Sequence, residues 1–154
     1  SDLTDGQTGL GLTGITATVQ KVTLPGTVAK IITRGANAYG YGYAAAMIVQ
    51  LNDGNYWGWG NNRAGGVATG DGGSVITPRR ALIPGREVDG SVMVPVMHFQ
   101  LACDQGGVQT NFILAASGYI YGWGYNARHL LSYSPVTANE RVPIRITPPW
   151  RRKG

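Results

Sequence analysis

One sequence motif occurs twice in this chain of 154 residues. Residues 47–62 (MIVQLNDGNYWGWGNN) align without gaps with residues 111–126 (NFILAASGYIYGWGYN), so residue 47 corresponds to residue 111 and the others follow in step. The positions that differ mostly keep their class: an apolar segment, a turn and an aromatic segment. A repeat at a fixed offset predicts an architecture of similar units that pack on their neighbours. Five positions are identical, and they are Gly54/Gly118, Gly58/Gly122, Trp59/Trp123, Gly60/Gly124 and Asn62/Asn126.

The segments between the turn signals have the composition of β-strands. Residues 15–24 alternate and are rich in β-branched side chains, and residues 45–51 are almost wholly apolar. No stretch long enough to be a helix has the helical period, so the chain is predicted to be all-β. Residues 60–77 are rich in Gly, Asn and Thr and are predicted to form a loop. Further strands are predicted at residues 28–33, 55–59, 92–102, 110–116, 119–123 and 141–147.

The ten residues at the five identical positions of the motif are interpreted as structural. A tryptophan at the end of an inner strand can fill the space between neighbouring sheets, and glycine beside it lets the backbone pass close to the ring. Asparagine can occupy a left-handed turn position and bond to the local backbone. These chemical roles favour packing over ligand binding at Trp59 and Trp123.

The order of these residues resembles the RCC1-like (regulator of chromosome condensation) repeat family. The resemblance rests on WGNN at residues 59–62, WGYN at residues 123–126 and DGQTGLG at residues 5–11. It implies a β-propeller made of RCC1-like blades, of which the chain would hold about two and a half repeats. The repeats are predicted as a half repeat over residues 1–35, repeats over 36–95 and 96–147, and a basic tail over 148–154. Another all-β repeat or a β-sandwich is the alternative fold.

Two and a half blades cannot close a ring, and an open propeller leaves two sheet edges unpaired. We therefore expect either a longer polypeptide, of which this chain is a piece, or several chains that complete the ring. The start in the middle of a repeat favours the longer polypeptide.

The positive charge is concentrated at the C-terminal end. The chain has 13 basic and 8 acidic residues, a net charge of +5. Residues 140–154 account for +4 of this, so the rest of the chain is almost neutral. A nucleic-acid-binding domain usually carries a basic face on its folded body. We therefore do not expect nucleic acid as a partner, and the tail is interpreted as a solvated end.

The residue types that catalysis and metal binding require are sparse. Cys103 is the single cysteine, and His98 and His129 are the only histidines. The stretch 9–14 matches a dinucleotide fingerprint, but a strand-like segment follows it where a helix is required. The longest apolar run, over residues 44–49, is too short for a membrane helix. We predict no enzymatic activity, no cofactor, no metal and no membrane span.

A row of tyrosines is the main candidate for ligand contact. Tyr39, Tyr41 and Tyr43 alternate with glycine, so their side chains would share one face of an extended chain. Such a row can stack on sugar rings or dock a protein, although a packed blade edge is the simpler explanation. Tyr133 and Trp150 are weaker candidates.

These observations predict a non-enzymatic binding or structural module. The low charge and the high content of Gly, Thr, Asn and Tyr favour a surface or virion protein, such as a receptor-binding phage tail fibre. Its partner would be a protein or a cell-surface glycan, and its location extracellular or on a virion. The alternative, implied by the resemblance, is an intracellular guanine-nucleotide exchange factor or chromatin-binding scaffold in the cytoplasm or nucleus.

Overall fold

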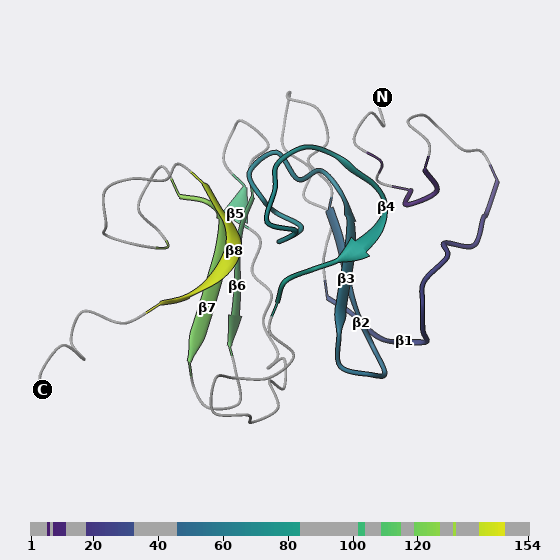
Figure 1. The fold of residues 1–154 in the computed structure, drawn as a ribbon, viewed down its shortest axis with the longest axis horizontal. Coiled ribbons are helices and arrows are strands. Elements are labelled where there is room, and N and C mark those ends of the chain that lie inside the picture. Colours follow the sequence, from purple (N-terminus) through teal and green to yellow (C-terminus); the bar gives the residue numbers. More distant parts are fainter. Residues whose placement is uncertain are drawn as a thin grey trace, which may run out of the picture.

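The computed structural model describes residues 6, 8–11, 18–32, 46–83, 102–103, 109–114, 119–126, 131 and 139–146. In this part, the chain forms two four-stranded antiparallel sheets and no helix (Figure 1). The fold class is therefore all-β, as predicted. The first sheet has the order β1 (Val28–Ile31), β2 (Ala46–Leu51), β3 (Tyr56–Gly60), β4 (Val75–Arg80). The second sheet has the order β5 (Ala102–Cys103), β6 (Gln109–Leu114), β7 (Ile120–Tyr125), β8 (Asn139–Ile146).

The central hairpins of the two sheets have the same register when the two copies of the motif are superposed. Met47 lies opposite Trp59 in the first sheet, and Asn111 lies opposite Trp123 in the second. All five residue pairs of one hairpin correspond to the five of the other. The repeated sequence therefore forms the same hairpin, with the same strand register, in both sheets. The pairs are Ala46–Gly60, Met47–Trp59, Ile48–Gly58, Val49–Trp57 and Gln50–Tyr56 in the first sheet, and Thr110–Gly124, Asn111–Trp123, Phe112–Gly122, Ile113–Tyr121 and Leu114–Ile120 in the second.

Both sheets have the same irregularity next to the edge strand. The register shifts between Gly58 and Gly60 where β3 meets β4, and between Gly122 and Gly124 where β7 meets β8. Gly60 has φ of 104° and Gly124 has φ of 103°, a region that favours glycine. The bulge therefore explains why glycine occurs twice at this position.

The predicted loop over residues 60–77 is wrong at its end, where the edge strand β4 begins at Val75. Val75 already lies opposite Gly60, so the strand begins inside the stretch predicted as loop. The register shift at Gly58 and Gly60 is the reason, because it lets β3 and β4 continue to pair beyond the bulge. The composition of residues 60–77 does not reveal this pairing. Pro78 lies in β4 and Pro143 in β8, which fits the preference of proline for edge strands and bulges.

The turn between β2 and β3 forms as the sequence predicts. The Gly54 N–H donates a bond of 2.9 Å to the Leu51 carbonyl oxygen, and Gly54 has φ of 83°. The carboxylate of Asp53 accepts bonds from the backbone N–H and the side-chain amide of Asn55, at 2.9 and 2.8 Å. These bonds lower the pKa of Asp53 below its usual value. Asp53 and Gly54 thus fix the hairpin locally.

The predicted strand over residues 15–24 is wrong where the structure describes it. Residues 18–24 are not in a strand, and Val19 is fully exposed. A strand requires a partner, and these residues pair with no strand in the described part of the chain. The strand predicted at residues 92–102 lies outside the described residues except for Ala102, which is in β5. Strand β1 pairs with β2, so it shares a sheet with residues assigned to the repeat over 36–95.

The hydrophobic core has two parts. One cluster lies between the sheets and joins Ile48 and Tyr56 of the first sheet to Ile113, Tyr121 and Trp123 of the second. The other cluster joins side chains of β2, β3 and β4 in the first sheet to Val67 of the loop between β3 and β4. The two sheets are therefore packed on each other through apolar side chains. The second cluster contains Ala46, Val49, Leu51, Trp59, Val67 and Val75.

Candidate functional site

The repeated asparagines hold equivalent loops. Asn62 follows β3 and Asn126 follows β7, and both side chains are buried. The side-chain oxygen of Asn62 accepts a bond of 2.9 Å from the Val67 N–H. That of Asn126 accepts a bond of 2.8 Å from the Leu131 N–H. Each asparagine thus satisfies a buried backbone donor five positions ahead and fixes the start of a loop.

The repeated glycines Gly58 and Gly122 make room for those loops. A Cβ atom on Gly58 would lie 2.6 Å from Cγ1 of Val67. A Cβ atom on Gly122 would lie 2.5 Å from Cδ2 of Leu131. Both distances are shorter than carbon atoms can approach, so a side chain folds over each glycine at the same place in the two sheets.

Trp123 connects the two sheets. Its side chain is fully buried, and its indole Nε1 donates a bond of 3.0 Å to the carbonyl oxygen of Gly66. The side-chain amide of Asn111 donates a second bond to the same oxygen, at 3.2 Å. Gly66 lies in the loop between β3 and β4, so a loop of the first sheet is bonded to the inner strands of the second.

Trp59, the counterpart of Trp123, also meets a loop from earlier in the chain. A Cβ atom on Gly9 would lie 2.9 Å from both Cδ1 and Nε1 of Trp59. Only glycine at position 9 therefore lets the backbone lie against the ring. Each repeated tryptophan is covered by a glycine-containing loop.

These two covering loops have the same conformation. The Gly9 N–H bonds to the Gly6 carbonyl oxygen at 2.9 Å, and the Ala68 N–H bonds to the Gly65 carbonyl oxygen at 2.9 Å. Ala68 is the single described residue other than glycine with a positive φ, and its counterpart is a glycine. The residues with positive φ correspond as Gly6 with Gly65, Gly9 with Ala68 and Gly11 with Gly70.

Both loops also bond to an edge strand. The Gly11 N–H donates to the Ile76 carbonyl oxygen of β4 at 2.8 Å. The Gly70 N–H donates to the Arg141 carbonyl oxygen of β8 at 3.1 Å. The contact between a loop and the following sheet is therefore built twice from equivalent residues.

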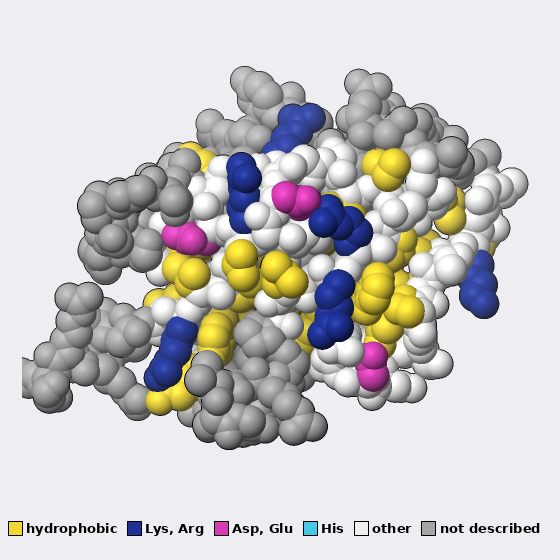
Figure 2. Space-filling model, in the orientation of Figure 1, with side chains coloured by type: hydrophobic (Ala, Val, Ile, Leu, Met, Phe, Trp, Pro, Cys, Tyr) yellow, Lys and Arg dark blue, Asp and Glu magenta, His cyan; other side chains and the backbone are white. Residues whose placement is uncertain are grey.

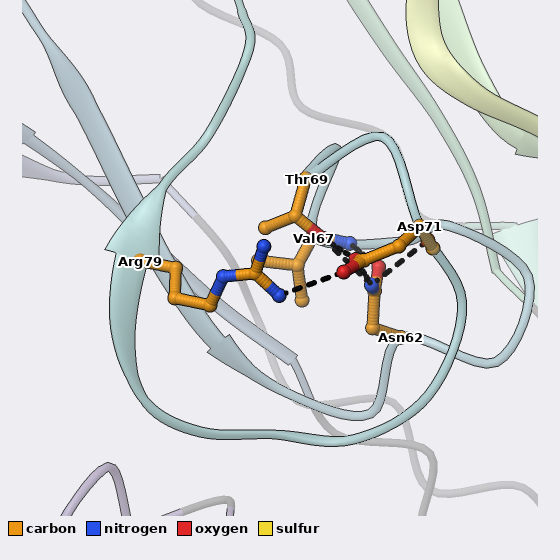
Figure 3. A network of polar contacts seen from close by, with 5 residues as sticks. All are labelled: Asn62, Val67, Thr69, Asp71 and Arg79. Carbon is orange, nitrogen blue, oxygen red and sulfur yellow. Dashed lines mark hydrogen bonds and ion pairs between the residues drawn. The ribbon is translucent and has the colours of Figure 1, made fainter.

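A polar network stabilises the loop between β3 and β4 (Figure 3). The side-chain amide of Asn62 donates to Oγ1 of Thr69 at 2.8 Å and to the carbonyl oxygen of Asp71 at 3.1 Å. The Thr69 hydroxyl donates to Oδ1 of Asp71 at 2.5 Å, and Arg79 donates to Oδ2 at 2.9 Å. The Thr69 bond, followed by that of Arg79, lowers the pKa of Asp71. The network joins the buried asparagine to the protein surface.

The edge strands form one exposed face that is basic and apolar. Figure 2 shows dark-blue basic side chains around a yellow band of hydrophobic side chains on the side where β8 passes in front of β7 in Figure 1. Two carboxylates adjoin them: Asp71 bonds to Arg79, and Glu140 precedes Arg141 in β8. We call this surface the arginine face; its exposed residues are Ile76, Arg79, Arg80, Leu82, Arg141, Val142 and Arg145.

Two arginines occupy equivalent positions at one end of the face. Arg80 lies opposite Trp57, and Arg145 lies opposite Tyr121. Arg80 donates a bond of 2.5 Å to the side-chain oxygen of Asn55. The guanidinium of Arg145 lies 3.2 Å from the centre of the Tyr119 ring, a cation–π contact. Each guanidinium group is thus oriented by the residue just before the strand that pairs with its own: Asn55 before β3, and Tyr119 before β7.

Arg141 lies where the two sheets meet. Its Cα atom would be 2.6 Å from a Cβ on Gly65, and its Nη2 would be 3.2 Å from a Cβ on Gly72. The side chain thus lies along the loop that carries Asp71, yet its guanidinium makes no hydrogen bond or ion pair with any residue the structure describes. Its charge is oriented by packing and stays exposed.

The predicted ligand-contact residues Tyr39, Tyr41, Tyr43 and Tyr133 lie outside the described residues, as do Trp150 and the basic tail. The same holds for Gly118, His98 and His129. The arginine face was missed by sequence analysis. A signal for it exists, because the edge strands both contain proline followed by arginine, in PRR at residues 78–80 and PIR at residues 143–145.

The described residues contain no group of three His, Cys, Asp or Glu side chains that could hold a metal ion. Within the same residues, no helix is long and apolar enough to cross a membrane.

No protein-family model matches the sequence, and no curated protein matches it significantly. Among solved structures, 32 chains match. One is human WBSCR16, an RCC1-like protein, with a TM-score of 0.60 and 28% sequence identity. The match covers 94% of this chain and 31% of the WBSCR16 chain, so the chain spans less than a third of that structure. The two all-β sheets are consistent with a partial β-propeller of RCC1-like blades.

Proposed function

We propose that the chain is a segment of an RCC1-like β-propeller that acts as a non-enzymatic binding scaffold. The observation that carries this proposal is the contact between a loop and the following sheet, which occurs twice with equivalent residues. The loop with Gly6 and Gly11 covers the first sheet, and the loop with Gly65 and Gly70 covers the second. A contact that repeats along the chain is the way in which repeat proteins extend a fold by adding units.

The chemistry of the repeated residues supports a scaffold. The buried amides of Asn62 and Asn126 are engaged with backbone groups, and the indole of Trp123 is engaged with Gly66. These polar groups hold loops in place, which is a structural role. The outward-facing edge strands are left to contact a partner.

The partner in this proposal is a protein. Further blades would come from the remainder of a longer polypeptide or from further copies of the chain. The structural similarity to WBSCR16 supports the propeller part of the proposal. A virion or tail-fibre role, a glycan ligand and an intracellular exchange or chromatin role remain predictions from the sequence.

The test is purification of the native polypeptide from its source at low salt, followed by identification of its stoichiometric components by mass spectrometry. We expect a protein component in a fixed ratio with the polypeptide. A polypeptide that elutes alone at every salt concentration would contradict the scaffold function.

A further inference from the structure

We propose that the arginine face binds an acidic peptide segment that also carries apolar side chains, an inference that rests on the scaffold function above. The face has four arginines, Arg79, Arg80, Arg141 and Arg145, and the carboxylates Asp71 and Glu140, and Asp53 lies close enough to Arg80 to interact with its charge. Four arginines against three carboxylates leave the face positive, and it lies on both sheets.

Two features make the arginines suitable for an acidic partner. Arg80 and Arg145 are held in place by Asn55 and Tyr119, so a partner orders fewer side chains when it binds. The guanidinium of Arg141 is exposed, and no carboxylate among the described residues neutralises it. A carboxylate of the partner can form a bidentate pair with such a group.

The face also has exposed apolar side chains, so a partner with acidic residues alone would not match it. Ile76 is 39% exposed, Val142 is 43% exposed and Leu82 is 47% exposed. Large aliphatic side chains at this exposure favour a partner that buries them. A peptide with both carboxylates and aliphatic side chains fits the two features together.

The backbone of the edge strands argues against simple strand addition. Pro78 and Pro143 have no N–H to donate to an added strand. The carbonyl oxygens of Ile76 and Arg141 already accept bonds from Gly11 and Gly70. Side chains, rather than a continuous backbone ladder, must therefore provide the binding energy.

The surface fits a peptide better than single-stranded nucleic acid. Proteins that bind single strands provide exposed aromatic rings on which bases stack. Every aromatic side chain in the described part of the chain is buried or half-buried. The Tyr119 ring is moreover already in contact with Arg145.

The proposal can be tested by fluorescence anisotropy with the full chain and a labelled dodecapeptide made of glutamate, leucine and serine. We expect binding that weakens as salt rises, because salt screens exposed charges. Arg141→Gln should weaken binding about fivefold, since one exposed charge pair contributes about 1 kcal/mol. Arg141→Lys keeps the charge but cannot form the bidentate pair, so its affinity should lie between those of wild type and Arg141→Gln.

Lys30→Gln is the matched control, because Lys30 is an exposed cation on β1, at the other edge of the first sheet. It should leave the affinity unchanged. Thermal unfolding of each variant separates lost binding from lost folding. Peptides with lysine for glutamate, or serine for leucine, should bind more weakly.

Three results would overturn the proposal: no binding at millimolar peptide, an equal loss in Lys30→Gln and Arg141→Gln, or tighter binding of a single-stranded oligonucleotide of matched length. A stoichiometric protein partner found in the native assembly, together with no peptide binding, would overturn this inference alone and leave the scaffold function standing.

Discussion

The indole Nε1 of Trp123 donates a hydrogen bond to the carbonyl oxygen of Gly66, 57 residues earlier in the chain. The two residues lie in different units of the repeat, so the bond joins the units rather than stabilising either one alone. Asn111, opposite Trp123 in the sheet, donates to the same oxygen. One carbonyl group of a glycine loop thus fixes the position of the second sheet relative to the first.

Replacing the tryptophan at this junction should be strongly destabilising. Trp123→Ala should lower the free energy of unfolding by about 3–5 kcal/mol, because a fully buried ring leaves a cavity. Denaturation with urea measures the change. Trp57→Ala, which removes a half-buried ring, is the control and should cost less. An unchanged midpoint for Trp123→Ala would show that the ring does not hold the sheets together.

A methyl group on Gly122 should be tolerated only when Leu131 is shortened. Gly122→Ala places a Cβ 2.5 Å from Cδ2 of Leu131 and should cost about 1–3 kcal/mol. Leu131→Ala removes the closest clashing atom, and the next, Cδ1 of Ile146 at 2.9 Å, is the end of a flexible side chain that can move. The double variant should therefore be more stable than the sum of the single changes predicts.

At Gly58 the same cycle should show less rescue by Val67→Ala, since a Cβ there would also lie 2.9 Å from the Met47 carbonyl oxygen. Additive effects at Gly122 and Leu131 would contradict the close packing described for this pair.

The repeated asparagines should be important in both units. Asn62→Ala and Asn126→Ala each leave a buried backbone N–H without its partner, which costs about 1–3 kcal/mol. Asn62→Ala removes, in addition, the bonds that its side-chain amide makes to Thr69 and Asp71. Asn52→Ala, at an exposed turn position, should be close to neutral. If Asn52→Ala were as costly as the other two, the loop-holding role would be wrong.

Sequence analysis succeeded where structure is determined by local chemistry. The hairpin turn at Asp53 and Gly54 needs no distant partner, and the aromatic strands with Trp59 and Trp123 have strong strand composition. The repeat also places an apolar segment, a turn and an aromatic segment in the same order twice, and these segments form the two central hairpins. These features made the all-β fold class predictable.

The failures concern residues whose conformation depends on a distant partner. Residues 18–24 have strand composition but pair with nothing in the described part of the chain, whereas Val75 pairs across a bulge. The arginine face was missed although its edge strands share a proline and an arginine, because that pattern does not show which residues meet in space. Arg79 bonds to Asp71 and Arg141 lies beside Gly72, so both are placed by one loop, and this follows only from the folded structure.

Acid should remove the contribution of Asp71 to stability. Bonds from Thr69 and Arg79 hold the pKa of this exposed carboxylate below its ordinary value of 3.8. A carboxylate with a lowered pKa in the folded state stabilises the protein above its unfolded pKa, and the contribution is lost as pH falls through the folded pKa. Asp71→Asn should therefore be less stable than wild type at pH 7 and similar to it near pH 2. A difference that stays constant over this range, measured by thermal unfolding, would contradict the role of the charge.

Removing a buried hydroxyl group should not destabilise the core. The Tyr56 hydroxyl oxygen is buried without a hydrogen-bond partner in the described structure, and burial raises the pKa of this group. Tyr56→Phe removes the desolvation cost and keeps the ring, so it should be neutral or stabilising by up to about 1 kcal/mol. Tyr56→Leu, which also removes the ring, is the comparison and should destabilise. A clear loss of stability in Tyr56→Phe would mean that the hydroxyl has a partner.

The central claim is that the two sheets are neighbouring blades of a larger propeller, joined at Trp123. An experimental structure of the native polypeptide, by electron cryomicroscopy or crystallography, tests it most directly. The account predicts at least one further four-stranded sheet around a common axis, with the Trp123–Gly66 bond at a boundary between blades. Two sheets stacked face to face as a closed sandwich, with no further sheet, would contradict it.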